Sequence, residues 1–497
     1  MKNIKKYLVV AAAMAVFGSC ELYKLPELPK PTAGTGGLDL TKMVSVGNSL
    51  TAGYMNGALY TAGQANSYPS IIAAQMAQAG GGTFNQPDIN STNGFFGTAG
   101  PTILGRLRLK LVNGAPTPTP QLPGDLPAPF TGNKAALNNF GVPGVTLQTA
   151  QIAALGGPAT SNPAYNALYA RFASNPSTDG VTGSTLIGDA AAALGNGGTF
   201  FTFWLGNNDV LGYATGGASN PTILTTPANF TARLGTALNA MLNAKADAEG
   251  AVANIPNVTD IPYFTTINPL AFVVPAASRA SLLAGINQLN GAIDAWNAAN
   301  AANPSAQRPR LSTNFDRYPL IILDPSLPDA VLPGPFTIPK IRNAVAADGI
   351  LMCLTAASNA NALPAGMGIS PANPMNEAAH DAFYLTQAEK TEIQAAIDSF
   401  NSSIAAAVNS NSSRLVLVDM NTAFKAVAAG TVTVNGSGIT ASLTPPFGAF
   451  SLDGVHPNAR GAAYIANLFI SAINAKWGST IPLCNPNNYP SNELPSP

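Results

Sequence analysis

Histidine and cysteine are scarce in this sequence. Its 497 residues include two histidines, His380 and His456, and three cysteines, Cys20, Cys353 and Cys484. A zinc site needs several such ligands at short spacing, and these five residues are far apart. The chain also has no Gly-Lys pair, so the usual phosphate-cradling loop is absent. We therefore expect neither a metal site nor a cofactor.

Charged residues are also few. They make up 10% of the chain, against 46% hydrophobic residues, which indicates a folded protein rather than a disordered one. The 24 basic residues balance the 24 acidic ones, and three of the lysines lie in a leader that we expect to be removed. Nothing in this balance indicates a nucleic-acid partner.

Long apolar runs are missing beyond Cys20, so we expect no membrane-spanning helix there. Residues 1–19 have a basic start, a short apolar stretch and small residues before Cys20, the pattern of a secretory signal. The position of Cys20 resembles a bacterial lipoprotein cleavage site, although Phe17 departs from the usual aliphatic residue. This resemblance implies a lipidated Cys20 and an anchored protein of the cell envelope. The alternative is simple secretion.

Export would place the two remaining cysteines in an oxidising compartment. A disulfide between Cys353 and Cys484 would close a long loop, worth roughly 4–5 kcal/mol in the chain-entropy model. Two separate buried thiols are the alternative.

Short apolar runs mark the predicted strands. They are not alternating, as expected of parallel strands buried on both faces, and they comprise Met43–Val46, Phe200–Leu205, Val252–Ile255 and Leu415–Val418. Apolar residues recur at helical spacing in three other segments. These are 282–296, 393–404, which follows a capping box of Thr386 and Glu389, and 462–477, which ends before Gly478. Strands that alternate with helices predict an α/β sandwich.

The boundaries follow from composition. Residues 20–38 are rich in proline and glycine and predict a tether, and the folded body is expected over 39–478. Two stretches, about 54–132 and 303–374, exceed a minimal α/β unit and are interpreted as insertions, where specificity is often built. Residues 479–497 are predicted to be a surface tail.

Ser49 follows the first predicted strand, in the phrase Gly47–Tyr54. A serine hydroxyl is a weak nucleophile unless a base and donors for an oxyanion surround it. His456 is the better of the two candidate bases, because Asp453 lies three residues before it and can orient the imidazole. Pro457 favours a loop at this point. His380 is interpreted as a solvated loop residue.

Two further strand exits offer neutral hydrogen-bond donors. Gly206, Asn207, Asn208 and Asp209 follow the second run, and the run Asn139–Gly144 ends in a glycine that can present its backbone N–H. The carboxyl ends of parallel strands are where open α/β sheets place their sites. Each run alone is typical of a turn.

Four blocks together resemble the GDSL or SGNH hydrolase family: GNSLTAGY at 47–54, NFGVPG at 139–144, GNND at 206–209 and DGVHP at 453–457. The resemblance implies a three-layer sandwich with five parallel strands, a flavodoxin-like order and long insertions. It also implies Ser49 as nucleophile, Asp453 and His456 as its partners, and Ser49, Gly144 and Asn208 as oxyanion donors.

Asn48 and Pro143 depart from the family pattern, but neither is a defining residue. The rival α/β-hydrolase elbow needs a glycine where Thr51 stands. Several other residues near these blocks are interpreted as structural: Asp209 as a loop support, Asp260 and Asp419 as turn or cap residues, and Tyr54, Tyr60 and Tyr68 as packing residues rather than walls of a cleft.

These observations predict a secreted, lipid-anchored serine esterase that acts through an acyl-serine intermediate on a small ester, a lipid or an acylated glycan. A surface lipoprotein that binds glycan or protein on an idle hydrolase fold is the alternative. The membrane contact would be the lipid on Cys20 alone.

Overall fold

A sheet of five parallel strands forms the centre of the protein, in a computed structural model that describes residues 33–112, 114–270, 272–334, 336–355 and 382–494. The order is β15-β8-β7-β1-β6. The strands are β1 (Met43–Gly47), β6 (Asn139–Gly141), β7 (Phe200–Trp204), β8 (Glu249–Ala253) and β15 (Leu415–Val418). Every predicted strand overlaps one of these, which confirms the parallel α/β sheet.

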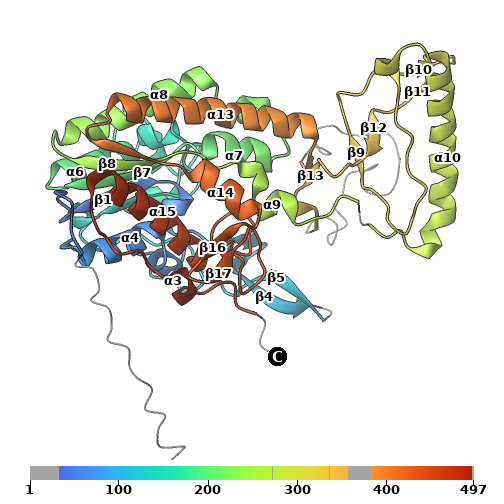
Figure 1. Cartoon of the computed structure of the whole chain (residues 1–497). Coiled ribbons are helices and arrows are strands. Elements are labelled where there is room, and N and C mark those ends of the chain that lie inside the picture. Colours follow the sequence, from blue (N-terminus) through green and yellow to red (C-terminus); the bar gives the residue numbers. More distant parts are fainter. Residues whose placement is uncertain (1–32, 113, 271, 335, 356–381, 495–497) are drawn as a thin grey trace, which may run out of the picture.

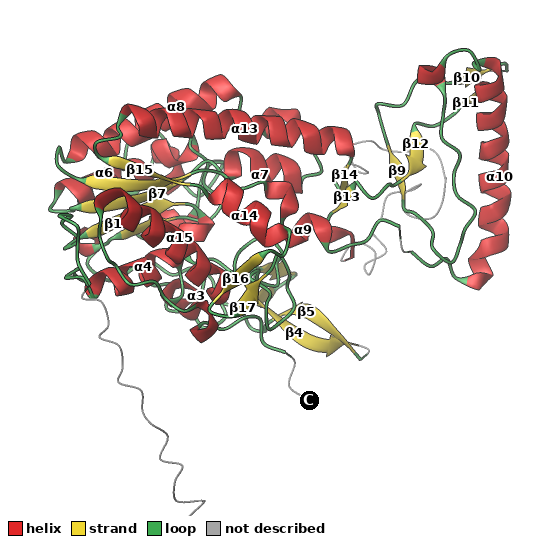
Figure 2. Ribbon diagram, in the orientation of Figure 1, coloured by secondary structure: helices red, strands yellow, loops and turns green. Residues whose placement is uncertain are grey.

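Helices cover both faces of this sheet, which gives three layers (Figures 1 and 2). One face packs against α6 (Leu186–Gly195), α8 (Pro227–Ala244) and α13 (Gln387–Ser410), and the other against α4 (Tyr68–Ala77) and α15 (Ala459–Trp477). We call this unit the body. No helix among the described residues is long and apolar enough to cross a membrane.

Alternation along the strands divides their side chains between the two layers. In β7, Phe201 and Phe203 join the α6 side, whereas Phe200 and Trp204 join the α15 side. Both sets are buried because a strand points successive side chains to opposite faces. This is why the strand reads as an unbroken apolar run in the sequence.

Local signals set the helix ends as expected. Thr386 and Glu389 form the predicted capping box at the start of α13. Asn458 caps α15 by accepting the N–H of Gly461 at 3.0 Å, and Gly478 ends that helix in the left-handed region.

The first predicted insertion, 54–132, contains a helix of the body. Tyr68, Ile71 and Ile72 of α4 are buried against the sheet, so α4 is part of the outer layer. The remainder is small: α3 (Thr61–Ala65) and two hairpins, formed by β2 (Gly97–Ala99) with β3 (Thr102–Leu104) and by β4 (Leu107–Val112) with β5 (Ala115–Pro120).

A second hydrophobic cluster lies outside the body and defines what we call the lobe, the described residues of 267–354 with 383–384 (Figure 1). The long helix α10 (Ala276–Ala299) packs Ile286, Leu289 and Ile293 into it. The lobe therefore begins well before the predicted start at 303, and part of that insertion, 356–374, lies outside the described residues. Its strands are β9 (Ile321–Leu323), β10 (Val331–Leu332), β11 (Phe336–Thr337), β12 (Ile341–Asn343), β13 (Gly349–Ile350) and β14 (Tyr384–Leu385).

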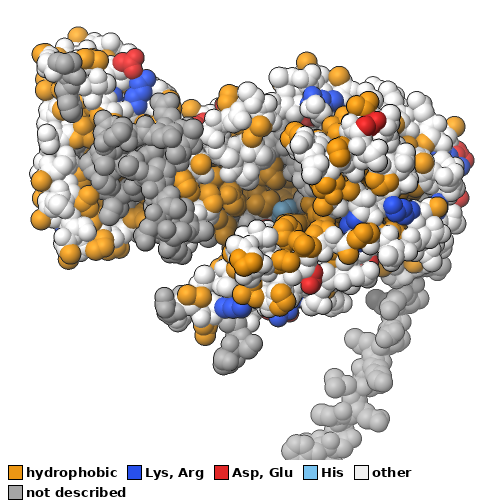
Figure 3. Space-filling model, turned by 180° about the vertical axis from the view of Figure 1, so that it is seen from behind, with side chains coloured by type: hydrophobic (Ala, Val, Ile, Leu, Met, Phe, Trp, Pro, Cys, Tyr) orange, Lys and Arg blue, Asp and Glu red, His pale blue; other side chains and the backbone are white. Residues whose placement is uncertain are grey.

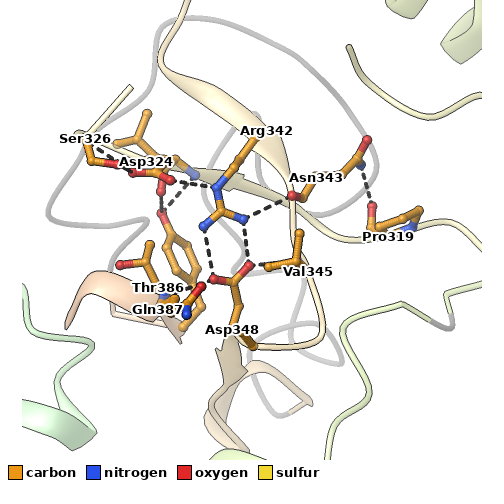
Figure 4. A network of polar contacts seen from close by, with 12 residues as sticks. Pro319, Asp324, Ser326, Arg342, Asn343, Val345, Asp348, Thr386 and Gln387 are labelled. Carbon is orange, nitrogen blue, oxygen red and sulfur yellow. Dashed lines mark hydrogen bonds and ion pairs between the residues drawn. The ribbon is translucent and has the colours of Figure 1, made fainter. Parts of the chain in front are cut away.

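An ion cluster around Arg342 joins the lobe to the body (Figure 4). The guanidinium contacts Asp324 at 2.6 Å and Asp348 at 2.6 and 3.0 Å. Asp348 also accepts the N–H of Gln387, the first residue of α13, at 3.2 Å. Although burial alone would lower the pKa of Arg342, its two carboxylate partners raise it.

The predicted tether and tail are partly packed. Leu38, Ile481 and Cys484 are buried in the cluster beneath α15, and Cys484 N donates to Asn467 Oδ1 at 2.9 Å. The prediction of a surface tail from Ile481 was therefore wrong, because α15 leaves apolar surface that the tail covers. Cys484 and Cys353 are both free and lie in different clusters, which corresponds to the two-thiol alternative.

Candidate active site

Ser49 lies where β1 ends and a short helix, α2 (Ser49–Ala52), begins. The Asn48 side chain accepts the N–H of Leu50 at 3.0 Å and so caps α2. Asn48 departs from the family pattern, but asparagine is a normal capping residue at this position. Because Ser49 is the first residue of the helix, its own N–H has no partner within it. The turn brings the Ser49 hydroxyl to the carboxyl edge of the sheet.

His456 and Asp453 lie on the loop that precedes α15. His456 Nε2 is 2.9 Å from Ser49 Oγ, and its Nδ1 is 3.1 Å from Asp453 Oδ2. The other carboxylate oxygen accepts the N–H of His456 at 2.9 Å. With Nδ1–H donating to Asp453, Nε2 is left to accept the serine proton. The structure brings together the three residues that the sequence selected.

The Asp453 carboxyl group is kept ionised by its surroundings. Burial alone would raise its pKa, but the charge and hydrogen bonds of His456, with the backbone N–H of His456 and Val455, lower it to about 2. An ionised Asp453 can hold the His456 ring in one tautomer and stabilise it when it becomes charged.

A turn from the first insertion completes the surroundings of Asp453, and sequence reasoning missed it. Gly57 N donates to Asp453 Oδ2 at 2.7 Å. Asn56 forms two hydrogen bonds with the same loop. Its backbone N donates to Ser451 Oγ at 2.9 Å, and its Oδ1 accepts the N–H of Leu452 at 3.0 Å. Asn56 and Gly57 have φ of 56° and 75°, as a two-residue Asn-Gly turn requires. That dipeptide is visible in the sequence, but its partner 396 residues away is not.

Tyr54 belongs to the same region. Its ring centroid is 4.8 Å from that of His456, and its hydroxyl donates to Gly57 O. Burial, followed by the nearby Asp453 charge, raises the Tyr54 pKa, so the phenol stays neutral. The other two tyrosines do not reach the site: Tyr68 stacks on Phe469 in the core, and Tyr60 lies under Arg106. The packing interpretation thus describes Tyr68, and it describes Tyr54 with the difference that Tyr54 packs against the site itself. Tyr60 is buried but also lines a separate pocket of about 210 Å³.

The two other strand exits face the same edge of the sheet. Gly144 lies on an exposed turn after β6 with φ of 80°, and its N–H donates to no described residue. Asn208 begins α7 (Asn208–Thr215), and its Nδ2 donates to Val145 O at 2.8 Å. Asp209 accepts the N–H of Leu147 at 2.9 Å, so it ties α7 to the Gly144 loop. This agrees with the predicted supporting role of Asp209.

A pocket of about 40 Å³ opens beside Ser49 and His456. Its walls come from loops and helices of the body and are mostly apolar: Leu50, Leu211, Val258, Ile261, Phe424 and Phe450. No Asp, Glu, Lys or Arg among the described residues lines it. His456 is the one histidine that the structure describes, and Figure 3 shows histidine surface in a hollow lined by hydrophobic side chains.

The remaining sequence candidates are placed as follows. Asp419 caps α14 (Met420–Ala428) through Thr422 N at 3.1 Å, and Asp260 ends a short 3-10 helix, Val258–Asp260. Cys20 and His380 lie outside the described residues. No cluster of three or more potential metal ligands occurs in the part of the chain that the structure describes.

Comparison of the chain with protein-family models, with curated proteins and with solved structures finds no significant match. Interpretation of this site therefore depends on the geometry of the residues and on the four sequence blocks.

Proposed function

We propose that this protein is a serine hydrolase of carboxylic esters, of the GDSL or SGNH type. The observation that carries the proposal is the hydrogen-bonded row from Ser49 Oγ to His456 Nε2 at 2.9 Å and from His456 Nδ1 to Asp453 at 3.1 Å. A serine, an imidazole and a carboxylate in this order can activate the hydroxyl as a nucleophile. The apolar pocket beside Ser49 suits a neutral acyl group.

The reaction would proceed in two displacements. Ser49 Oγ attacks the ester carbonyl carbon while His456 Nε2 takes the hydroxyl proton. The bond from that carbon to the alcohol oxygen then breaks, and the oxygen leaves with the proton from His456. Water attacks the acyl-serine in the same way, with His456 again the base, and releases the acid and free Ser49.

Three donors would stabilise the negative oxygen of the intermediate. The N–H of Ser49 and the N–H of Gly144 donate to no residue that the structure describes. The Asn208 amide is held by Val145 O at 2.8 Å and has a second N–H to give. Their assignment follows the family resemblance. Fixed neutral donors of this kind stabilise charge without reorganising during the reaction.

The architecture supports the same proposal. From β6 to β15, the strands of the sheet stand in the order 2-1-3-4-5 when they are numbered by their position in the chain. Ser49 follows β1, next to the point where this order reverses. Ligand sites of open α/β sheets lie at such switch points. The flavodoxin-like SGNH fold with two insertions is part of the proposal, as is a lipid anchor on Cys20 at the bacterial cell envelope.

The first test is hydrolysis of a chromogenic acetyl ester by the wild type and by Ser49→Ala. Activity in the wild type and a loss of several orders of magnitude in the variant are expected. Equal turnover by the two proteins would contradict Ser49 as the nucleophile. No turnover by either protein across short and long acyl chains would favour the alternative of a binding protein on an idle hydrolase fold.

A further inference from the structure

One polar side chain at the pocket has no hydrogen-bond partner among the described residues. Asn48 accepts from Leu50, Ser49 contacts His456, and Asn208 donates to Val145. The Asn207 side chain also lines the pocket, yet it forms no hydrogen bond with any described residue, and its Oδ1 is fully buried. Asn207 as a whole is only 4% exposed. A buried amide without partners is unfavourable, so it is a place where a ligand group can be expected.

Helix capping does not account for this asparagine. Asn207 immediately precedes α7, where an asparagine normally accepts a backbone N–H of the first turn. Here its φ of −59° and ψ of −42° are helical, and its side chain makes no capping bond. A typical capping residue is extended, so the helical geometry of Asn207 agrees with its missing capping bond, and the residue lies in the wall of the pocket.

The surroundings restrict what this amide can bind. The walls near it, such as Leu211, Val258 and Phe450, are apolar and no Asp, Glu, Lys or Arg among the described residues is present, which disfavours a charged group. An amide both donates and accepts, so a hydroxyl group is a matching neutral partner. The pocket is small, at about 40 Å³, which favours a short chain.

We propose that Asn207 is a substrate-binding residue that hydrogen-bonds a hydroxyl group on a short acyl chain, so that the preferred substrate is an ester of a short hydroxy acid. This inference depends on the proposed esterase function. It assigns Asn207 a role in choosing the substrate, whereas its neighbour Asn208 would act on the oxyanion.

The test compares two chromogenic esters with the same leaving group, 4-nitrophenyl 3-hydroxybutanoate and 4-nitrophenyl 3-methylbutanoate. The two esters differ at one position of the acyl chain, where the first carries a hydroxyl group and the second a methyl group of similar size. The wild type is expected to prefer the hydroxy ester by about tenfold or more in kcat/KM, as for one buried hydrogen bond. Asn207→Leu, close in size, should remove or invert this preference.

Two further variants make the result decisive. Asn207→Ala should lose the same preference, and it serves if the leucine variant fails to fold. Leu211→Ala, on the apolar wall, should lower kcat/KM for both esters while keeping their ratio. A wild type that prefers the methyl ester, or Asn207 variants that keep the wild-type ratio, would overturn the inference.

Labelling by a serine-directed fluorophosphonate separates this outcome from a failure of the proposed function. If Ser49 of the wild type is labelled and the ester ratio does not depend on Asn207, the inference alone is wrong. If Ser49 is not labelled and neither ester is hydrolysed, the proposed function fails, and the inference fails with it.

Discussion

The body and the lobe differ in the interactions that organise them. The body places its candidate site through backbone geometry, because Ser49, Gly144 and Asn208 follow the carboxyl ends of parallel strands. The described part of the lobe contains two-stranded sheets and is tied to α13 by the Arg342 ion cluster (Figure 4). The strands of a parallel sheet can be recognised in a sequence from their apolar runs, whereas a few long-range side-chain pairs cannot.

The two regions meet beside the candidate site. Tyr263 N donates to Gly454 O, and Met352 N donates to Tyr263 O, each at 2.9 Å. Gly454 lies between Asp453 and His456 and has φ of 74°, and a Cβ there would lie 2.4 Å from Met352 Sδ. The root of the lobe therefore packs against the loop that carries the base.

The largest effect is expected from breaking the ion cluster that stabilises the lobe and ties it to α13. Asp348→Ala leaves the guanidinium of Arg342 with one carboxylate, and the Asp348 side chain is fully buried. We expect the free energy of unfolding to fall by about 3–5 kcal/mol, the usual cost of removing one partner of a buried pair. Denaturant titration measures this effect.

Asp294→Ala is the matched control in the same lobe. Asp294 pairs with Arg310, and both side chains are well exposed, at 49% and 60%. Its removal should cost less than about 1 kcal/mol. Equal effects of the two substitutions would contradict the importance given to the buried cluster.

A substitution at Asn208 disturbs the site of the body. Asn208→Ala is expected to lower kcat by about 10²–10³-fold, the usual loss for one oxyanion donor, with the KM for the chromogenic ester little changed. Steady-state kinetics on that ester measures both constants.

Asn421→Ala provides the comparison, because Asn421 is another buried asparagine at the carboxyl edge, bonded to Ile255 O at 2.9 Å and outside the pocket. It should lower stability and leave kcat nearly unchanged. If both variants lose kcat alike, Asn208 acts through folding and not on the oxyanion.

The smallest expected effect concerns pH. The Asp453 pKa is lowered from its usual 3.8 to about 2 in the folded protein, so its contribution to stability is present above pH 4–5 and is lost as the pH falls towards 2. This contribution is about 2 kcal/mol. The difference in unfolding free energy between wild type and Asp453→Asn should shrink by that amount from pH 5 to pH 2. A difference that stays constant would contradict the assigned pKa.

The core of the site was predictable from the sequence. An apolar run marked the strand before Ser49. Two histidines left little choice of base, and Asp453 lies three residues before His456. These three residues were therefore selected, and they do lie together. The parallel sheet followed from this run and the other apolar runs. Here short-range patterns carry the information, because strand ends and turns depend on neighbouring residues.

The rest depends on contacts that no local pattern records. The bond from Gly57 to Asp453 joins residues 396 apart, and the walls of the pocket come from several elements. Helix α10 was expected from its spacing, but its place in the lobe was not, since an apolar face does not say which core it joins. The same holds for Ile481 and Cys484 in the predicted surface tail.

The most direct test of the central claim is mass spectrometry of the protein after treatment with a serine-directed fluorophosphonate. We predict one adduct, on Ser49, formed in step with the loss of esterase activity and strongly slowed in His456→Ala. Ester turnover without an adduct on Ser49, or activity lost through an adduct on a different serine, would contradict the role of Ser49 as the nucleophile.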